Sequence, residues 1–271
     1  MSELDKKYEK FRPKKFLGQN FLVDENIAKK IISFLDIKDG DNVLEIGPGH
    51  GALTKHLIKF NINYTAVELD KFIVEELTNK YGDKINLIHK DFLEFDFSQL
   101  HNFTTSPIKV IGNIPYNITT EILFKLYDNK QFVQSAVLMM QKEVAQRLTA
   151  KPNTKDYGIL AILTQVNAVP KIVYNVPPTA FFPKPKVTSS VVRLELKNDS
   201  YVIKDVDLFK KIVKSSFNQR RKVMRNSLKK LFEEKGIEFE SVNFDFSKRP
   251  EQLSIQEFVE LTNSINNILR S

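Results

Sequence analysis

The sequence lacks cysteine altogether and holds only four histidines among its 271 residues. Without cysteine, the protein can form no disulfide bond, use no thiolate nucleophile and build no zinc site from thiolates. None of the histidines has a second metal ligand at the usual short spacing, so a histidine zinc site is not expected either. We therefore expect a site that works without a bound metal.

Long apolar runs are also missing. No stretch reaches the roughly 20 apolar residues that a membrane-spanning helix needs. The first 16 residues have no apolar segment of the kind found in secretory signals, and Glu3, Asp5 and Glu9 fit poorly with an organelle transit peptide. We therefore expect a cytoplasmic protein with no membrane partner.

The composition is that of a globular protein with a basic surplus. Hydrophobic residues make up 42% of the chain and charged residues 27%, so a sizeable core can form. Lysine and arginine number 41 against 33 aspartates and glutamates, which gives a net charge of +8. A surplus of this size favours a polyanionic partner such as a nucleic acid.

Up to about residue 196, short apolar runs alternate with helical patterns. This alternation predicts an α/β fold in which a parallel, doubly wound sheet has helices on both faces. The expected strands are residues 43–46, 64–69, 85–89, 108–113, 136–141, 159–168 and 190–196. The expected helices are residues 24–35, 52–60, 71–81, 119–129 and 142–150. The last strands are separated by proline-rich loops and allow an antiparallel pair.

The pattern changes after residues 198–200. Residues 206–235 and 254–269 have helical periodicity, and no further strand is expected. We therefore predict two domains, residues 1–199 with the sheet and residues 200–271 as a small helical domain.

A glycine-rich turn follows the first expected strand and opens a helix. This turn, Gly47–Gly51, lets a ligand approach the backbone closely. Glu68 ends the next strand, about 20 residues later, where a carboxylate suits ribose hydroxyls. Asp91 ends the third strand and can either bind an adenine amine or cap a helix. The turn fits both NAD and S-adenosylmethionine, although Pro48 lacks the N–H that a pyrophosphate cradle would use.

The tetrapeptide Asn113-Ile114-Pro115-Tyr116 follows the fourth expected strand. An adenine amine is a poor nucleophile because its lone pair is delocalised into the ring. The side-chain oxygen of Asn113 and the carbonyl of Ile114 can accept its two hydrogens and favour a pyramidal nitrogen. Pro115 would stiffen the turn, and Tyr116 offers an aromatic face for a flipped base. This arrangement predicts methyl transfer to an adenine by positioning and electrostatics.

Taken together, these motifs resemble the ribosomal RNA adenine dimethyltransferases, close to the branch that acts on the small ribosomal subunit. The match is nearly continuous over residues 14–196. Its landmarks are GQNFL at 18–22, EIGPGHG at 45–51, NIPYN at 113–117, MQKEVA at 140–145, YG at 157–158 and FFPKPKV at 181–187. The resemblance implies a class I methyltransferase fold, Rossmann-like, with a seven-stranded, mostly parallel sheet and a small C-terminal helical domain. It also implies S-adenosylmethionine-dependent dimethylation of two adjacent adenines in a hairpin loop near the 3′ end of small-subunit ribosomal RNA.

The resemblance assigns roles to individual residues. It implies cofactor contacts for Asn20, Leu22, Gly47, Glu68, Asp91 and Asn113. At the target adenine, Asn113 would touch both the methionine moiety and the amine. Tyr116 and Phe181 would stack on opposite faces of the base.

Two basic clusters are candidates for RNA contact, although a solvated helix face is the usual fate of such a charge run. The first lies in residues 217–230, where Met224, Leu228 and Leu231 share one helix face and cations occupy another. Its candidate residues are Arg220, Arg221, Lys222, Arg225 and Lys229. The second cluster is Lys6, Lys7, Lys10, Arg12, Lys14 and Lys15.

Three alternatives remain open beside this function. The fold can serve large-subunit rRNA dimethylation of the antibiotic-resistance type, or a ribosome-assembly factor that has lost catalysis. An NAD dehydrogenase is disfavoured because no histidine or lysine acid can be placed at the strand ends. The expected partner is the immature small ribosomal subunit, and the resemblance favours a monomer.

Overall fold

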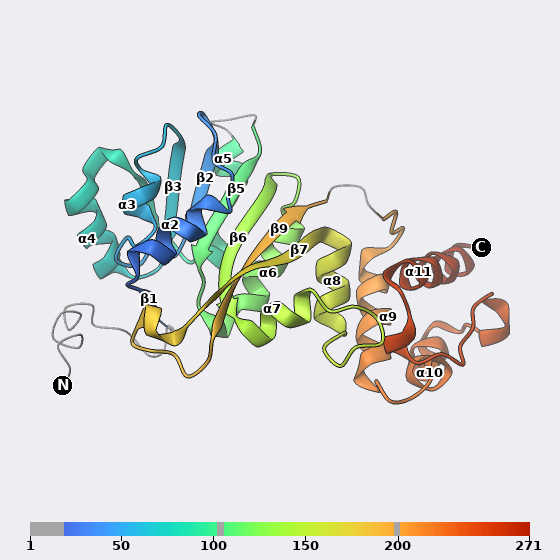
Figure 1. Cartoon of the computed structure of the whole chain (residues 1–271). Helices are drawn as coiled ribbons and strands as arrows, with labels where there is room; N and C mark the ends of the chain where they lie inside the picture. The colour runs from blue at the N-terminus through green and yellow to red at the C-terminus, as the bar shows by residue number, and fades with distance from the viewer. Residues whose placement is uncertain (1–18, 102–105, 198–200) are drawn as a thin grey trace. The chain divides into compact units, whose positions relative to one another are not determined.

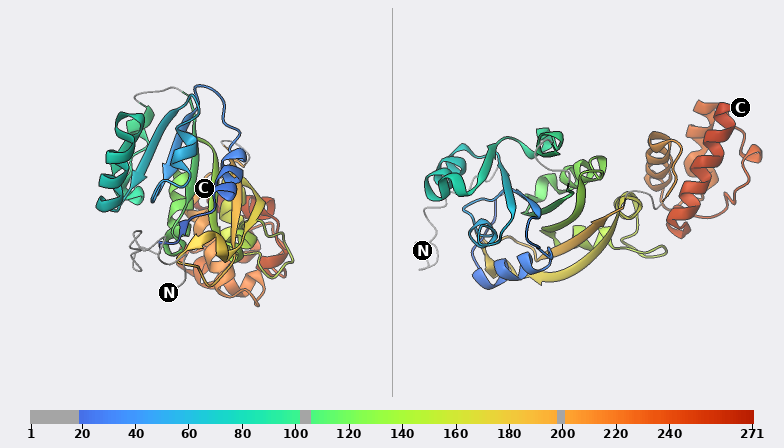
Figure 2. Two further views of the ribbon diagram at one scale, coloured as in Figure 1. Left: turned by 60° about the vertical axis from the view of Figure 1, so that its left-hand side comes forward. Right: turned by 90° about the horizontal axis from the view of Figure 1, so that it is seen from above.

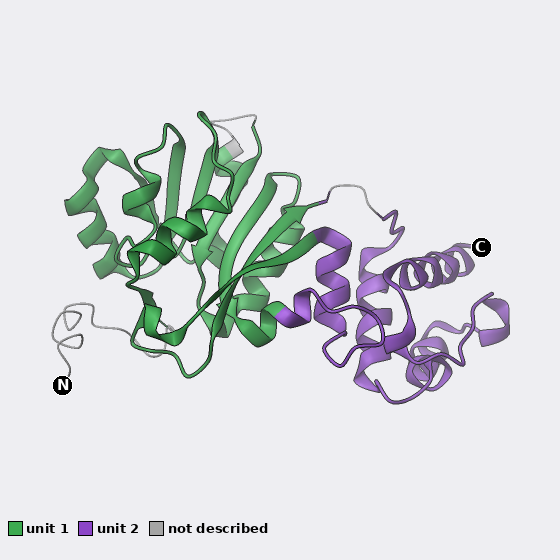
Figure 3. Cartoon of the chain, in the orientation of Figure 1, with its two compact units in different colours: residues 1–145, 169–196 green, residues 146–168, 197–271 purple. Residues whose placement is uncertain are grey.

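The computed structural model describes residues 19–101, 106–197 and 201–271 (Figure 1). Contacts divide the chain into two units, residues 1–145 with 169–196 and residues 146–168 with 197–271 (Figure 3). This division differs from the expected boundary at residue 199, because residues 146–168 join the helical unit. Within that unit, α8 (Ile159–Asn167) packs against α9 (Val206–Asn218).

A seven-stranded sheet forms the centre of the first unit, in the order β4-β3-β2-β5-β6-β9-β7. Its strands are β2 (Asn42–Ile46), β3 (Asn63–Glu68), β4 (Asn86–His89), β5 (Ile108–Asn113), β6 (Val133–Gln141), β7 (Ala168–Val176) and β9 (Ser189–Leu196). The strands from β4 to β6 run parallel, and β9 is antiparallel to β6. The expected mostly parallel sheet with an antiparallel pair is therefore confirmed.

A separate two-stranded ribbon lies in the same unit. It pairs β1 (Phe21–Leu22) with β8 (Phe181–Phe182) in antiparallel register, Leu22 opposite Phe181. The Val23 N–H donates to the Ala180 carbonyl at 2.8 Å. This ribbon brings the segment before the first helix next to a proline-rich loop that lies about 160 residues later in the chain.

Helices lie on both faces of the sheet, as Figure 2 shows. The helices of this unit are α2 (Glu25–Ser33), α3 (Thr54–Leu57), α4 (Lys71–Tyr81), α5 (Ser98–His101) and α6 (Thr119–Asp128), and α7 (Lys142–Leu148) crosses the division at residue 145. In α2 the Asp24 carboxylate caps the N-terminus by accepting from the Asn26 and Ile27 N–H groups. The buried face of α2 then packs into the core of the unit. The central strands β2 and β3 are buried on nearly every position because helices cover both faces.

One expectation about the strands is wrong. The sequence predicts a strand over residues 159–168, but residues 159–167 form helix α8. The expectation fails because a continuous apolar run does not by itself distinguish a buried strand from a buried helix. The strand instead follows as β7, which contains Pro170. A proline is tolerated there because β7 is an edge strand.

The second unit is helical, as expected. It contains α8, α9, α10 (Met224–Lys235) and α11 (Ile255–Arg270). The single helix expected over 206–235 is divided at residues 219–223, so α9 and α10 are separate. The Tyr157 hydroxyl, which is fully buried, donates to the Leu253 carbonyl at 2.9 Å and ties two segments of the unit together.

Short 3-10 turns complete the description. They occupy Gly82–Lys84, Phe92–Glu94, Tyr116–Ile118, Pro178–Ala180, Phe239–Ser241 and Pro250–Gln252. Over the three described ranges, none of the helices has the length and apolar character needed to cross a membrane.

Candidate active site

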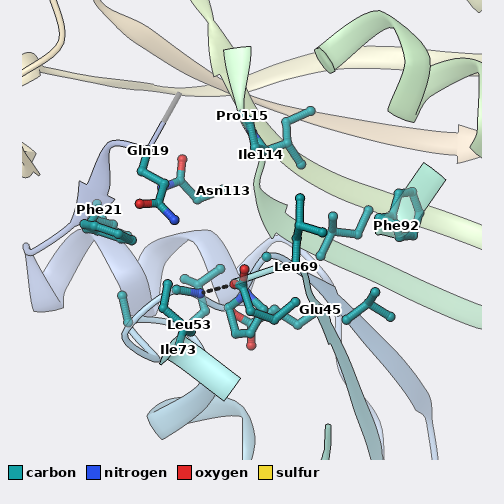
Figure 4. A pocket seen from close by; sticks show the side chains of 18 of the residues that line it. Gln19, Phe21, Glu45, Leu53, Leu69, Ile73, Phe92, Asn113, Ile114 and Pro115 are labelled. Atoms are coloured by element: carbon teal, nitrogen blue, oxygen red, sulfur yellow. Dashed lines mark hydrogen bonds between the residues drawn. The ribbon is translucent and has the colours of Figure 1, made fainter. Parts of the chain in front are cut away.

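A pocket of about 420 Å³ opens at the carboxyl ends of β2, β3, β4 and β5. Ligands of open α/β sheets gather at this edge. In Figure 4, Asn113 lies beside Gln19 on one side of the pocket, and Leu53 and Ile73 lie on the other. The pocket brings together seven residues expected from the sequence: Asn20, Leu22, Gly47, Glu68, Asp91, Asn113 and Tyr116.

The glycine turn forms the floor of this pocket with backbone angles that favour glycine. Gly47 has a φ of 60°, and a Cβ built there would meet nothing within 4 Å, so the turn faces open space. Gly49 has a φ of 53°, and its added Cβ would lie 3.1 Å from the Phe21 ring. The turn therefore leaves room for a ligand at Gly47 and for the Phe21 ring at Gly49.

Glu68 holds the glycine turn against the end of β3. Its side chain is 7% exposed and accepts from the Gly49 N–H at 3.2 Å and from the Asp70 N–H at 2.9 Å. Burial raises the pKa of this carboxyl above its ordinary value, while the backbone hydrogen bonds act in the opposite direction. Each oxygen accepts at least one backbone hydrogen bond, and a carboxylate has about four acceptor positions, so capacity remains for a ligand hydroxyl.

Asp91 combines the two roles that its position suggested. One carboxylate oxygen accepts from the Leu93 N–H at 2.8 Å and caps the turn Phe92–Glu94. The residue also lines the pocket, beside the buried ring of Phe92. Its second oxygen is thus held in a defined direction by a capped turn, which suits an acceptor for an adenine amine.

Asn113 is oriented by a partner far away in the chain. Its Nδ2 donates to the Asn20 carbonyl at 2.8 Å. A carbonyl oxygen can only accept, so the nitrogen of the amide must face it and Oδ1 must face the other way. The hydrogen bond therefore orients the amide of a residue that lines the pocket and leaves Oδ1 as its acceptor, which is the atom that methylating an amine requires.

Tyr116 lies on the turn that follows Asn113. Pro115 precedes it with a φ of −60°, and Thr119 Oγ1 donates to the Pro115 carbonyl at 3.1 Å. The Tyr116 hydroxyl shares a hydrogen bond of 2.6 Å with Ser189 Oγ on β9. Burial raises the pKa of this phenol above its ordinary value, and the hydrogen bond with Ser189 acts in the opposite direction.

Phe181 does not line this pocket. Its side chain is 2% exposed and packs in the hydrophobic core beneath the ribbon of β1 and β8. The role as a second stacking aromatic consequently stays a prediction.

Glu45 is a site residue to which the sequence analysis gave no role. It lines the pocket from β2, is 2% exposed, and accepts at Oε2 from the Tyr64 hydroxyl at 2.5 Å and from Thr54 Oγ1 at 2.9 Å. Burial raises the pKa of Glu45 to about 7. The sequence did contain a signal for this residue, since an acid inside a short apolar strand needs polar partners.

The predicted RNA-contact residues of the second unit fall into two groups. Arg220 stabilises the unit itself, because it forms an ion pair with Glu251 at 2.7 Å and donates to the carbonyls of Thr154 and Lys155. In contrast, Arg221 and Lys222 are exposed and form no ion pair with any described residue.

The other two candidates are neutralised by acids. Arg225 pairs with Glu240 at 2.6 Å and lies over the Phe239 ring, and Lys229 lies 3.8 Å from Glu233. The cluster at residues 6–15 lies outside the described residues. Within the described ranges, no group of three or more histidine, aspartate or glutamate side chains could hold a metal ion.

Comparisons with known proteins assign the chain to a family. The family profile described as "Ribosomal RNA adenine dimethylase" matches residues 10–267. The "Ribosomal RNA small subunit methyltransferase A" of Francisella tularensis subsp. novicida (strain U112) is 42% identical over 260 residues, covering 95% of this chain and 99% of the relative.

Two solved structures are similar over 91% of this chain. A dimethyladenosine transferase from Plasmodium falciparum has a TM-score of 0.75 and 26% identity, with 98% of that chain covered. The 23S rRNA methyltransferase ErmE has a TM-score of 0.65 and 22% identity, with all of that chain covered. The expected class I methyltransferase fold with a C-terminal helical domain is therefore confirmed.

Proposed function

The chain belongs to the ribosomal RNA adenine dimethylase family, and from this premise we propose that it dimethylates two adjacent adenines in a hairpin loop near the 3′ end of small-subunit ribosomal RNA. The enzyme is an rRNA adenine dimethyltransferase that uses S-adenosylmethionine. The observation that carries the proposal is the orientation of the Asn113 amide, whose nitrogen is bound to the Asn20 carbonyl.

The polar residues that line the pocket suit the donor. S-adenosylmethionine supplies an electrophilic methyl group on a sulfonium. Glu68 would accept from the ribose hydroxyls, and Asp91 would accept from the amine of the donor's adenine. The open space above Gly47 leaves the glycine turn accessible. Asn20 and Leu22 would close over the donor from the N-terminal side.

The turn after β5 would then activate the target amine. Asn113 Oδ1 and the Ile114 carbonyl accept its two hydrogens, which favours a pyramidal nitrogen with its lone pair directed outward. Tyr116 holds the base by stacking, and Phe181 completes the stack if the ribbon of β1 and β8 admits the base. A base inside a paired RNA cannot reach this pocket, so the target must be unpaired or flipped.

Substitution of Asn113 tests this mechanism directly. The variant Asn113→Ala loses the acceptor, and we expect methyl transfer to fall about 100- to 1,000-fold while donor binding is largely kept. Asn86→Ala is a matched control, because the Asn86 amide donates to Thr65 Oγ1 at 3.1 Å at the opposite edge of the sheet. The assay uses labelled S-adenosylmethionine, unmethylated small subunits and nucleoside analysis. Full activity of Asn113→Ala would refute the assigned role.

Mapping the methylated nucleotide separates the proposal from its alternatives. Methylation of large-subunit RNA would support the antibiotic-resistance type of enzyme. Binding of immature small subunits without methyl transfer would support an assembly factor, although the polar pocket residues described above argue against lost catalysis. Action on the immature subunit, in the cytoplasm and as a monomer, belongs to the same proposal.

The second unit would supply contacts to RNA phosphates. Arg221 and Lys222 are the strongest of the five candidates, because they are exposed and unpaired among the described residues. Replacing both with alanine should weaken subunit binding and reduce the slope of log affinity against log salt by about 2. Lys230→Ala is the control, since Lys230 lies 3.7 Å from Glu234. An unchanged salt slope in the double variant would remove these two residues from the interface.

A further inference from the structure

Ser189 is a buried residue at the start of β9 that the proposed mechanism does not use. It is fully buried, it is paired in register with Gln141 of β6, and it does not line the pocket. Its Oγ lies 2.6 Å from the Tyr116 hydroxyl. The sheet therefore fixes one end of a hydrogen bond whose other end is the aromatic ring in the pocket.

We propose that Ser189 is a positioning residue for methyl transfer, because it holds the Tyr116 ring in the direction that receives the target adenine. This inference rests on the proposed function of the same pocket. The Tyr116 ring is then held at both ends: the Pro115 turn sets its backbone, and Ser189 holds its hydroxyl. A hydroxyl lies on the long axis of its phenol ring, so fixing the oxygen fixes the direction of that axis.

The loss of this bond should affect transfer more than donor binding. Without Ser189 Oγ, the half-buried Tyr116 hydroxyl has no partner there and turns toward water, which tilts the ring away from the base. Stacking is sensitive to such a tilt, whereas Glu68 and Asp91 bind the donor at other strand ends. We therefore expect Ser189→Ala to lower kcat with RNA about 5- to 10-fold and to leave KM for S-adenosylmethionine unchanged.

A double-mutant cycle distinguishes positioning from general packing. Tyr116→Phe keeps the ring and removes the hydroxyl that needs a partner. If Ser189 acts only through Tyr116, then adding Ser189→Ala to Tyr116→Phe has no further effect, and the double variant is as active as Tyr116→Phe. If the two losses multiply, Ser189 acts through the packing of β9 and the proposal is wrong.

Ser190 provides a matched control on the same strand. It is also fully buried, and its Oγ donates to Asn175 Oδ1 at 2.7 Å. Ser190→Ala should lower the melting temperature about as much as Ser189→Ala but leave kcat unchanged. Equal losses of kcat in the two variants would overturn the proposal. A wild-type protein that transfers no methyl group would instead overturn the proposed function, so the two failures are distinguishable.

Discussion

The buried carboxyl of Glu45 should make the stability of the first unit depend on pH. Glu45 is 2% exposed on β2, and its Oε2 accepts from Tyr64 and Thr54. Burial is the main cause of a pKa of about 7, compared with an ordinary value of 4.5, and the nearby charge of Glu68 acts in the same direction. The hydrogen bonds from Tyr64 and Thr54 lower the pKa but do not compensate for burial.

Proton linkage gives the sign and the size of the pH dependence that Glu45 adds to the free energy of unfolding. Between pH 4.5 and pH 7 the folded protein keeps a proton on Glu45 that the unfolded chain has already lost. Stability must therefore fall as the pH rises through this window, and a change of this size in pKa corresponds to about 3 kcal/mol in all. Glu45→Gln resembles the protonated carboxyl in shape and has no charge to bury. Its free energy of unfolding should lack this contribution at every pH.

The measurement is the free energy of unfolding of wild type and Glu45→Gln, obtained from urea titrations at pH 5, 6, 7 and 8 at constant ionic strength. Groups that do not interact with Glu45 titrate equally in both proteins, so the difference between the two curves reports Glu45 together with its interaction with Glu68. We expect that difference to grow by about 2.5 kcal/mol in favour of the variant from pH 5 to pH 8. Parallel curves over this range would show that Glu45 is not protonated in the fold and would refute the reasoning.

Three shorter predictions concern the fold and the donor. Gly112→Ala should lower the free energy of unfolding by about 1–3 kcal/mol, because the added Cβ would lie 2.7 Å from the Ile46 carbonyl in the centre of the sheet; an unchanged urea midpoint would contradict this. Glu68→Ala should weaken S-adenosylmethionine binding at least 10-fold in calorimetry, since it removes the proposed ribose acceptor and its hydrogen bonds to Gly49 and Asp70; equal affinity would exclude the ribose role. Arg220→Ala should lower the melting temperature while Arg221→Ala leaves it unchanged, because only Arg220 bridges segments of its unit; equal shifts would contradict that distinction.

Local signals account for the features that the sequence predicted well. The glycine turn, Glu68 and Asp91 each lie at or just after the carboxyl end of a strand, and the carboxyl ends of parallel strands share one edge of a sheet. Strand positions and the connection rules of parallel sheets were therefore enough to bring these residues together. No knowledge of side-chain contacts was needed.

Contacts between distant segments account for what the sequence could not predict. Phe181 is buried because β8 pairs with β1, and nothing near Phe181 in the chain specifies that pairing. The acids that neutralise Arg220 and Arg225 are Glu251 and Glu240, which lie outside the basic segment. Residues 217–230 contain no aspartate or glutamate. Counting charges within this segment alone therefore overstated how many of its cations are unpaired.

The turn after β5 shows how these long-range contacts determine the chemistry. A flexible asparagine amide could present either its oxygen or its nitrogen to a ligand, and the Asn20 carbonyl decides between them. A tyrosine ring could tilt in several directions, and Ser189 selects one. Asn20 and Ser189 come from segments on either side of the turn in sequence, and neither supplies an acid or a base. The rate of methyl transfer should therefore depend on groups that never exchange a proton with the substrate, because the reaction requires an oriented acceptor and an oriented ring rather than a strong base.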